Sequence, residues 1–222
     1  MTKASLLYCE FGIFFSQPIE STYKLIKEIP EHYKVFDRDP VNIPVPEEAI
    51  NLFGTALESS NNIWRIEASR TRINIVFTPP YSEKKKYEDI ENELKKIKEI
   101  LTNLIEEAQK QNVQISRITN ISRLITIIKD PVNYLEKKFF KSESQNRSDL
   151  TLRFNDPINE KNLPCNNITL HETAKKEDTG EIGILTLRDF NTDDTKKKLL
   201  TIEDINNFWE ITKKYSHMSG LE

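Results

Sequence analysis

Residues 63–78 read IWRIEASRTRINIVFT, and this stretch decides the fold class. On both sides of Ser69, apolar and polar residues alternate, which is the pattern of two half-buried β-strands joined as a hairpin. One face takes Trp64, Ile66 and Ala68 from the first strand and Ile73, Ile75 and Phe77 from the second. The other face takes Arg65, Glu67, Arg70, Arg72 and Asn74. The stretch therefore predicts an antiparallel sheet with one solvated side.

Other segments extend this sheet. Residues 6–15 place a wholly apolar set on one face, formed by Leu7, Cys9, Phe11, Ile13 and Phe15. Residues 113–128 are rich in β-branched side chains and favour a long strand. Because Ile118, Ile121, Ile125 and Ile128 also suit helical spacing, a helix stays open there. Residues 150–155, 167–173 and 181–190 read as three further strands.

The strongest helical signal covers residues 83–112. Its apolar residues step by 3 and 4 over three heptads: Tyr87, Ile90, Leu94, Ile97, Leu101, Leu104 and Ala108. Thirty residues predict a rod of roughly 45 Å at 1.5 Å per residue. Residues 130–140 and 201–215 predict shorter helices, with Pro131 and Thr201 near their first turns.

These elements predict an α+β fold, in which a mainly antiparallel sheet is covered by helices that include one of about 30 residues. The 222 residues fit a single domain over 1–222. Two related strand–helix–strand halves, residues 1–112 and 113–222, are an alternative organisation of the same chain.

The middle of the chain resembles a sporadically distributed family of uncharacterised prokaryotic proteins of similar length. The resemblance rests on residues 72–77, Pro80-Tyr81, the long amphipathic helix, residues 117–121 and residues 130–140 with Tyr134-Leu135. In order of elements it extends over residues 5–215, and it implies an α+β fold with two related halves. The family has no established activity, so no functional residues are carried over. An accessory role in a prokaryotic defence or conflict system would be compatible with the resemblance.

Charge, apolar run length and cysteine count argue against several classes of protein. The chain has 32 Lys and Arg against 35 Asp and Glu, a net charge of −3, so global charge does not favour nucleic acid or an anionic membrane. No apolar run approaches the length of a membrane-spanning helix, and a cytoplasmic location is expected. Cys9 and Cys165 stand alone, which excludes a disulfide framework and predicts buried thiols.

Sequence motifs for known chemistry do not occur. The five glycines form neither a P-loop nor a GxGxxG fingerprint, and the three histidines have no metal-ligand spacing. Asp178-Thr179-Gly180 matches the three-residue active-site motif of aspartic proteases. Because it lies in a segment rich in Lys and Glu between two predicted strands, a turn is favoured. We therefore predict no catalytic residue, no metal and no cofactor, while an enzyme with a pocket lacking known motifs stays open.

Two sets of residues are candidates for binding. The first is an arginine strip on the polar sheet face, formed by Arg65, Arg70, Arg72, Arg117 and Arg123, which suits phosphate or carboxylate ligands. Its structural alternative is a solvated face with ion pairs to acids such as Glu67 or Asp189. We expect no aromatic side chains between these arginines, which argues against stacking of single-stranded nucleic acid.

The second candidate set is the helix seam of Tyr87, Ile90, Leu94, Ile97, Leu101 and Leu104. It either forms ordinary core against the sheet or pairs with a partner protein or a second copy of the chain. We favour a binding protein that uses the long helix, the polar sheet face or both. A nucleic-acid or nucleotide binder using the arginine strip is the alternative.

Overall fold

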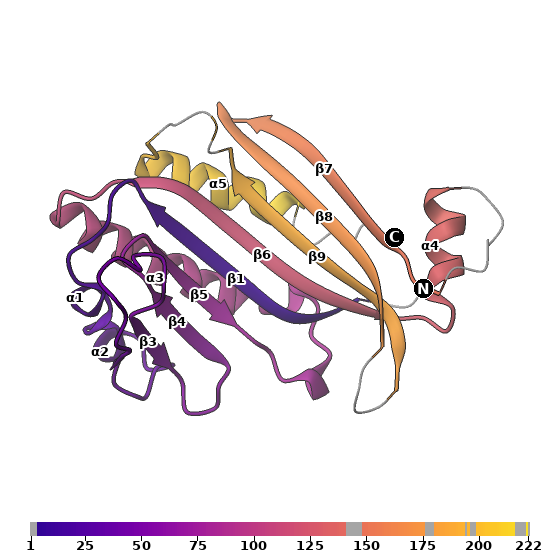
Figure 1. Cartoon of the computed structure of the whole chain (residues 1–222), viewed down its shortest axis with the longest axis horizontal. Helices are drawn as coiled ribbons and strands as arrows, with labels where there is room; N and C mark the ends of the chain where they lie inside the picture. The colour runs from indigo at the N-terminus through magenta and orange to yellow at the C-terminus, as the bar shows by residue number, and fades with distance from the viewer. Residues whose placement is uncertain are drawn as a thin grey trace.

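The structure is a computed structural model and describes residues 4–140, 148–175, 180–193, 195, 199–215 and 221 (Figure 1). Asp178 and Thr179 of the predicted turn lie outside these residues, as does His217. Within the described part, nine strands form one antiparallel sheet in the order β2-β3-β4-β5-β1-β6-β9-β8-β7. The strands are β1 (Ser5–Phe15), β2 (Val41–Asn42), β3 (Thr55–Glu58), β4 (Trp64–Ala68), β5 (Arg72–Phe77), β6 (Ile115–Ile127), β7 (Thr151–Glu160), β8 (Leu163–Lys175) and β9 (Ile182–Thr192).

The α-helices are α1 (Thr22–Ile26), α2 (Ile29–His32), α3 (Glu91–Lys110), α4 (Pro131–Phe139) and α5 (Ile202–Tyr215). α3 and α5 lie next to each other against the same side of the sheet (Figure 1). α5 begins with a capping box, because the Asp204 amide donates to Thr201 Oγ1 at 3.1 Å and Asp204 Oδ2 accepts from the Thr201 amide at 2.9 Å. None of the helices in the described part of the chain is long and apolar enough to cross a membrane.

The predicted fold class is wrong in its long helix. The helix expected over residues 83–112 is α3, which has 20 residues. Lys84 has a φ of 47°, a left-handed conformation that ends the preceding 3₁₀ turn, and Tyr87–Ile90 form a second 3₁₀ turn. The Leu6 amide donates to the Lys85 carbonyl at 2.6 Å, so this segment follows the edge of β1 before α3 starts. The apolar spacing continues through these turns because a 3₁₀ turn also repeats about every three residues.

Each half begins with the predicted order of strand, helix and strand, but further strands and a second helix follow. β1 and β6 pair with each other at the centre of the sheet, and each is flanked by the last strand of a three-stranded meander. β3, β4 and β5 form the meander beside β1, and β7, β8 and β9 form the one beside β6. A helix follows each meander, α3 in the first case and α5 in the second. The repeated order is therefore strand, helix, meander, helix.

One apolar core lies between the sheet and the two long helices. It includes Phe11 and Ile75 from the sheet, Ile97 and Leu104 from α3, and Phe208 from α5. These side chains are at most 2% exposed. Because α3 and α5 supply this cover, the opposite side of the sheet is not needed to bury the core.

Candidate ligand-binding face of the sheet

The two sides of β1 have different surroundings. Cys9, Phe11 and Ile13 point to the helices and are buried, and the Phe11 ring stacks on Trp209 of α5 at 4.7 Å between ring centres. Tyr8 and Phe14, an odd number of positions along the strand from these residues, point to the other side and are half-buried. No helix in the described part of the chain covers this side of the central strands, which we call the open face (Figure 1).

Strand register brings two arginines next to Phe14 on the open face. Phe14 pairs with Arg72 of β5 on one side and with Arg117 of β6 on the other. The Arg117 guanidinium carbon lies 5.3 Å from the centre of the Phe14 ring, and that of Arg72 lies 4.6 Å from the ring of Phe53. We call Phe53, Arg72, Phe14 and Arg117 the arginine row. Such contacts hold a guanidinium against an aromatic plane.

A second pair of the same kind lies further along the central strands. Tyr8 of β1 pairs with Arg123 of β6, and the guanidinium carbon is 5.2 Å from the tyrosine ring centre. Among the described residues, the buried Nε atoms of Arg72 and Arg123 have no hydrogen-bond partner. Both side chains are therefore positioned by stacking rather than by an acid.

The remaining two predicted arginines have other partners. Arg65 lies on the open face, paired in register with Val76, and its Nε is 3.4 Å from the Glu67 carboxylate. Arg70 lies in the turn between β4 and β5, where its Nε donates to the Ile19 carbonyl at 3.1 Å. Register thus unites Arg65, Arg72, Arg117 and Arg123 on one face, but Arg70 is held at the backbone that follows β1.

From β5 to β9, an uncharged row separates the arginine row from Glu10 and Asp189, and Glu67 of β4 lies at the end of this row, paired with Asn74. Gly12 lies between Asn74 of β5 and Thr119 of β6, and Thr119 pairs with Asn191 of β9. All three polar side chains are buried. A Cβ atom on Gly12 would lie 2.8 Å from Thr119 Oγ1 and 3.1 Å from Asn74 Oδ1. Because glycine has no Cβ, the side chains of Thr119 and Asn74 can both lie above Gly12.

The next row carries the acids. Glu10 lies between Val76 and Ile121 at the centre of the sheet. Burial raises the pKa of Glu10, and the nearby Glu67 carboxylate adds to this effect. Ile121 pairs with Asp189 of β9, which accepts a hydrogen bond from the Asn191 amide at 2.9 Å. Glu10 therefore lies two rows away from Arg72, whose charge lowers the pKa of Glu10 against the effect of burial.

The expectation that aromatic side chains are missing from this face is wrong. Phe14 and Tyr8 lie on the open face, each next to an arginine of β6. The signal was present in the sequence, since strict alternation along residues 6–15 places every second residue opposite the apolar set. It could not be used without the strand order, which makes β6 the neighbour of β1. The prediction that Arg117 and Arg123 share a face is confirmed by the register.

The helix seam lies inside the molecule. Its residues Tyr87, Ile90, Ile97, Leu101 and Leu104 are buried in the core, and Leu94 packs at the edge of the core. Tyr87 and Ile90 precede α3 and come from the 3₁₀ turn. The seam thus faces the chain's own sheet.

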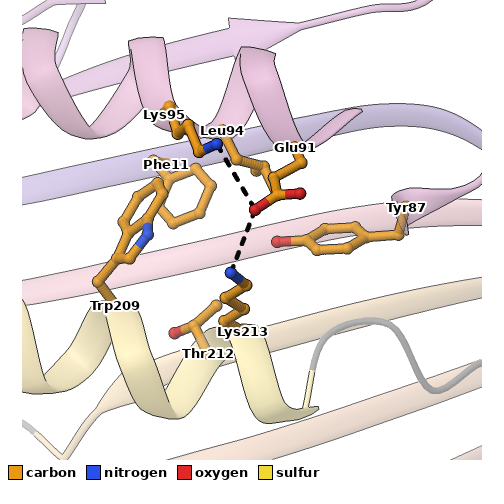
Figure 2. Close-up of a pocket in the computed structure, with 8 residues that line it drawn as sticks. All are labelled: Phe11, Tyr87, Glu91, Leu94, Lys95, Trp209, Thr212 and Lys213. Carbon is orange, nitrogen blue, oxygen red and sulfur yellow. Dashed lines mark hydrogen bonds and ion pairs between the residues drawn. The ribbon is translucent and has the colours of Figure 1, made fainter. Parts of the chain in front are cut away.

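A cavity of about 40 Å³ lies between α3 and α5 (Figure 2). Phe11, Trp209 and Leu94 form its apolar wall, and Glu91 at its rim is 3.7 Å from Lys95 Nζ and 3.4 Å from Lys213 Nζ. The hydrogen bond from Lys213 and the charge of Lys95 lower the pKa of Glu91. Ligand pockets usually have volumes of about 300 Å³ or more, so this cavity is of the size that holds water.

Metal and thiol chemistry find little support in the described residues. These residues contain no group of three or more His, Cys, Asp or Glu side chains that could hold a metal ion. Burial raises the pKa of Cys9 to about 12, and burial raises that of Cys165 to about 12 as well. Both thiols are therefore protonated and unreactive in the folded protein.

Comparison with known proteins adds no family to these observations. Protein-family models show no match to the chain, and no curated protein matches it. The resemblance to a sporadic prokaryotic family stays a prediction. Function is therefore inferred from the chemistry of the open face.

Proposed function

We propose that this is a binding protein, that its ligand surface is the open face of the sheet, and that the ligand is anionic. The observation that supports the proposal is the arginine row, where two arginines flank Phe14 across three neighbouring strands. A guanidinium stacked on a ring keeps its N–H groups directed sideways, in the fork geometry that suits phosphate and carboxylate oxygens.

A solvated face of structural ion pairs is the competing explanation. Arg65 fits it, because its Nε faces Glu67 at 3.4 Å. Arg72 does not, because its buried Nε has no hydrogen-bond partner among the described residues. A half-buried cation without a paired acid is costly to desolvate, and an anionic ligand would offset this cost.

The proposal also includes a cellular location and leaves out a protein partner at α3. We place the protein in the cytoplasm, since two unbridged cysteines fit a reducing compartment. Pairing through the α3 seam is not included, because the seam side chains would have to leave the core to meet a partner. An accessory role in a defence or conflict system has no support beyond the resemblance.

Binding of inorganic polyphosphate, a probe that carries charge and no bases, tests the proposal. Isothermal calorimetry at several salt concentrations would compare the wild type with Arg72→Ala/Arg117→Ala. We expect salt-sensitive binding to the wild type and a salt slope smaller by about two in the variant, one for each arginine. The control is Arg153→Ala/Lys213→Ala, which removes the same charge at two other places, the edge strand β7 and helix α5.

Equal losses in both double variants would mean that net charge, not the arginine row, attracts the probe. No binding at low salt would contradict the proposal directly. Circular dichroism of each variant shows that the fold is retained.

A further inference from the structure

We infer that the anionic ligand is single-stranded nucleic acid, which crosses β5, β1 and β6 along the arginine row and stacks at least one base on a ring–guanidinium pair. The inference rests on the proposed function and adds the class of ligand. It depends on three properties of the open face: its stacked planes, its flatness and its charge pattern.

The first property is the stacking of arginines on aromatic rings, which binding of a simple anion does not require. Three arginines of the open face lie against aromatic rings: Arg72 on Phe53, Arg117 on Phe14 and Arg123 on Tyr8, with separations of 4.6 to 5.3 Å. Nucleic-acid bases stack on aromatic rings and on guanidinium planes. A base placed on a guanidinium would therefore continue a stack that the protein already contains. The same arginine can meet a phosphate with its N–H edge.

The shape of the face suits an unpaired strand. Neighbouring strands are about 4.8 Å apart, so Arg72 and Arg117, two strands apart, are separated by roughly 10 Å. A single strand crossing this distance can turn its bases toward the sheet. A duplex keeps its bases inside, and its grooves admit a helix or a two-stranded ribbon rather than a broad sheet. Stacking of bases would therefore need a single strand.

The charge pattern defines the path. In the row beside the arginine row, β5, β1, β6 and β9 carry the uncharged residues Asn74, Gly12, Thr119 and Asn191, and β4 carries Glu67 next to Asn74. The row after it carries Glu10 and Asp189, which repel a polyanion. The ligand is therefore confined to the arginine row and to the adjoining part of β1 and β6 around Gly12. An acidic peptide would have no groups for the stacked planes.

The binding strength is expected to be moderate and local. The chain has a net charge of −3, so attraction comes from a few arginines and not from the molecule as a whole. Affinity should fall steeply with salt, and stacking should contribute the part that salt does not remove.

Fluorescence anisotropy with labelled oligonucleotides tests the inference. The probes are a 12-nucleotide oligo(dT), an abasic strand of equal length and a duplex of equal length. We expect oligo(dT) to bind at least about fivefold more tightly than the abasic strand and the duplex, which is the gain from stacking one base. Phe14→Leu should lower oligo(dT) affinity by about the same factor and polyphosphate affinity by less, because the ring stacks a base only in the first case and positions Arg117 in both.

The control variant is Phe154→Leu, which changes a partly exposed phenylalanine of the edge strand β7. It should bind every probe as the wild type does. Thermal melting shows whether either variant is misfolded, and Phe53→Leu, at the other ring of the arginine row, provides a second stacking variant if Phe14→Leu is.

The outcomes separate the two proposals. If polyphosphate and the abasic strand bind as tightly as oligo(dT), and both depend on Arg72 and Arg117, the single-strand inference is overturned while the anionic ligand stands. Tighter binding of the duplex also overturns it. If no polyanion binds, both proposals fail.

Discussion

The helix side and the open face of β1 are built from alternate residues of one strand, yet different requirements govern them. On the helix side, Phe11 and Ile13 are buried under α3 and α5, and their identity follows from packing. On the open face, Tyr8 and Phe14 are half-buried beside arginines and contact no helix of the described residues. Packing the core explains the first set and leaves the second unexplained.

The comparison teaches where to look for function when no motif is present. Side chains that the fold needs are those whose removal leaves a cavity, and these lie between the sheet and the helices. Removing an aromatic or arginine side chain from the open face would leave no cavity in the core.

The largest effect is expected from truncating a phenylalanine on the helix side. Phe208 of α5 is fully buried and packs on Phe190 at 5.4 Å between ring centres. Phe208→Ala should lower the free energy of unfolding by about 4 kcal/mol, because it leaves a large cavity. Phe14→Ala should lower it by less than about 1 kcal/mol. Urea denaturation of both variants measures the difference, and similar losses would contradict the division of the two faces.

A pH effect should come from the buried histidine of β8. His171 lies on the helix side, where Nδ1 is 2.9 Å from Thr186 Oγ1 and its ring stacks on Phe139 of α4. Burial lowers the pKa of His171 to about 4, and the charge of Arg188 adds to the effect. Between about pH 6.5 and 4, the unfolded chain binds a proton that the folded protein does not, so stability falls as pH falls.

The loss through this window should reach about 3 kcal/mol at pH 4. His171→Leu removes the titrating group, so its stability should depend less on pH by this amount. Chemical denaturation at pH 7, 5.5 and 4 gives the comparison, and parallel pH profiles for the two proteins would refute the assignment.

A smaller effect is expected at Gly12, which lies under two side chains of the open face. Gly12→Ala places a Cβ 2.8 Å from Thr119 Oγ1, so Thr119 and Asn74 must move. We expect a loss of about 1 kcal/mol in unfolding free energy. Thr119→Ala removes the closest atom, so the double variant should be more stable than the sum of the single losses predicts. Strict additivity would show that the contact is unimportant.

The smallest effect should come from the arginine row itself. Arg72→Ala and Arg117→Ala should each change the free energy of unfolding by less than about 0.5 kcal/mol, because neither side chain fills the core. Thermal and urea denaturation of both variants provide the test. A loss of several kcal/mol would assign these arginines to the fold and remove the reason for giving them a binding role.

Much of the sheet could be predicted from the sequence, because alternation is a strong local signal. The hairpin around Ser69 and the long strand after residue 113 are confirmed as β4, β5 and β6. The helix was predicted too long, since the apolar spacing of Tyr87 and Ile90 fits a 3₁₀ turn as well as an α-helix. The backbone shows where the helix is interrupted, because Lys84 has a φ of 47° and Lys86 is extended before the second 3₁₀ turn.

The candidate site was predictable in its parts but not as a whole. Period two places Arg72 and Arg117 on polar strand faces, and it places Phe14 opposite the apolar set of β1. That these three side chains meet depends on β1 lying between β5 and β6, which is a long-range property of the chain. Arg188, also on a predicted strand, does not reach the open face. It is buried on the helix side and donates to the Tyr215 carbonyl at 2.5 Å.

Photocross-linking is the most direct test of the central claim that one face of the sheet serves the fold and the other binds a ligand. A single-stranded oligonucleotide carrying a photoreactive thymidine would be irradiated with the wild-type protein, and adducts would be located by mass spectrometry. We predict adducts on Phe14, Phe53 and the neighbouring residues of β5 and β6, and their loss in Arg72→Ala/Arg117→Ala. Adducts confined to α3, α5 or the edge strands, unchanged in that variant, would contradict the account.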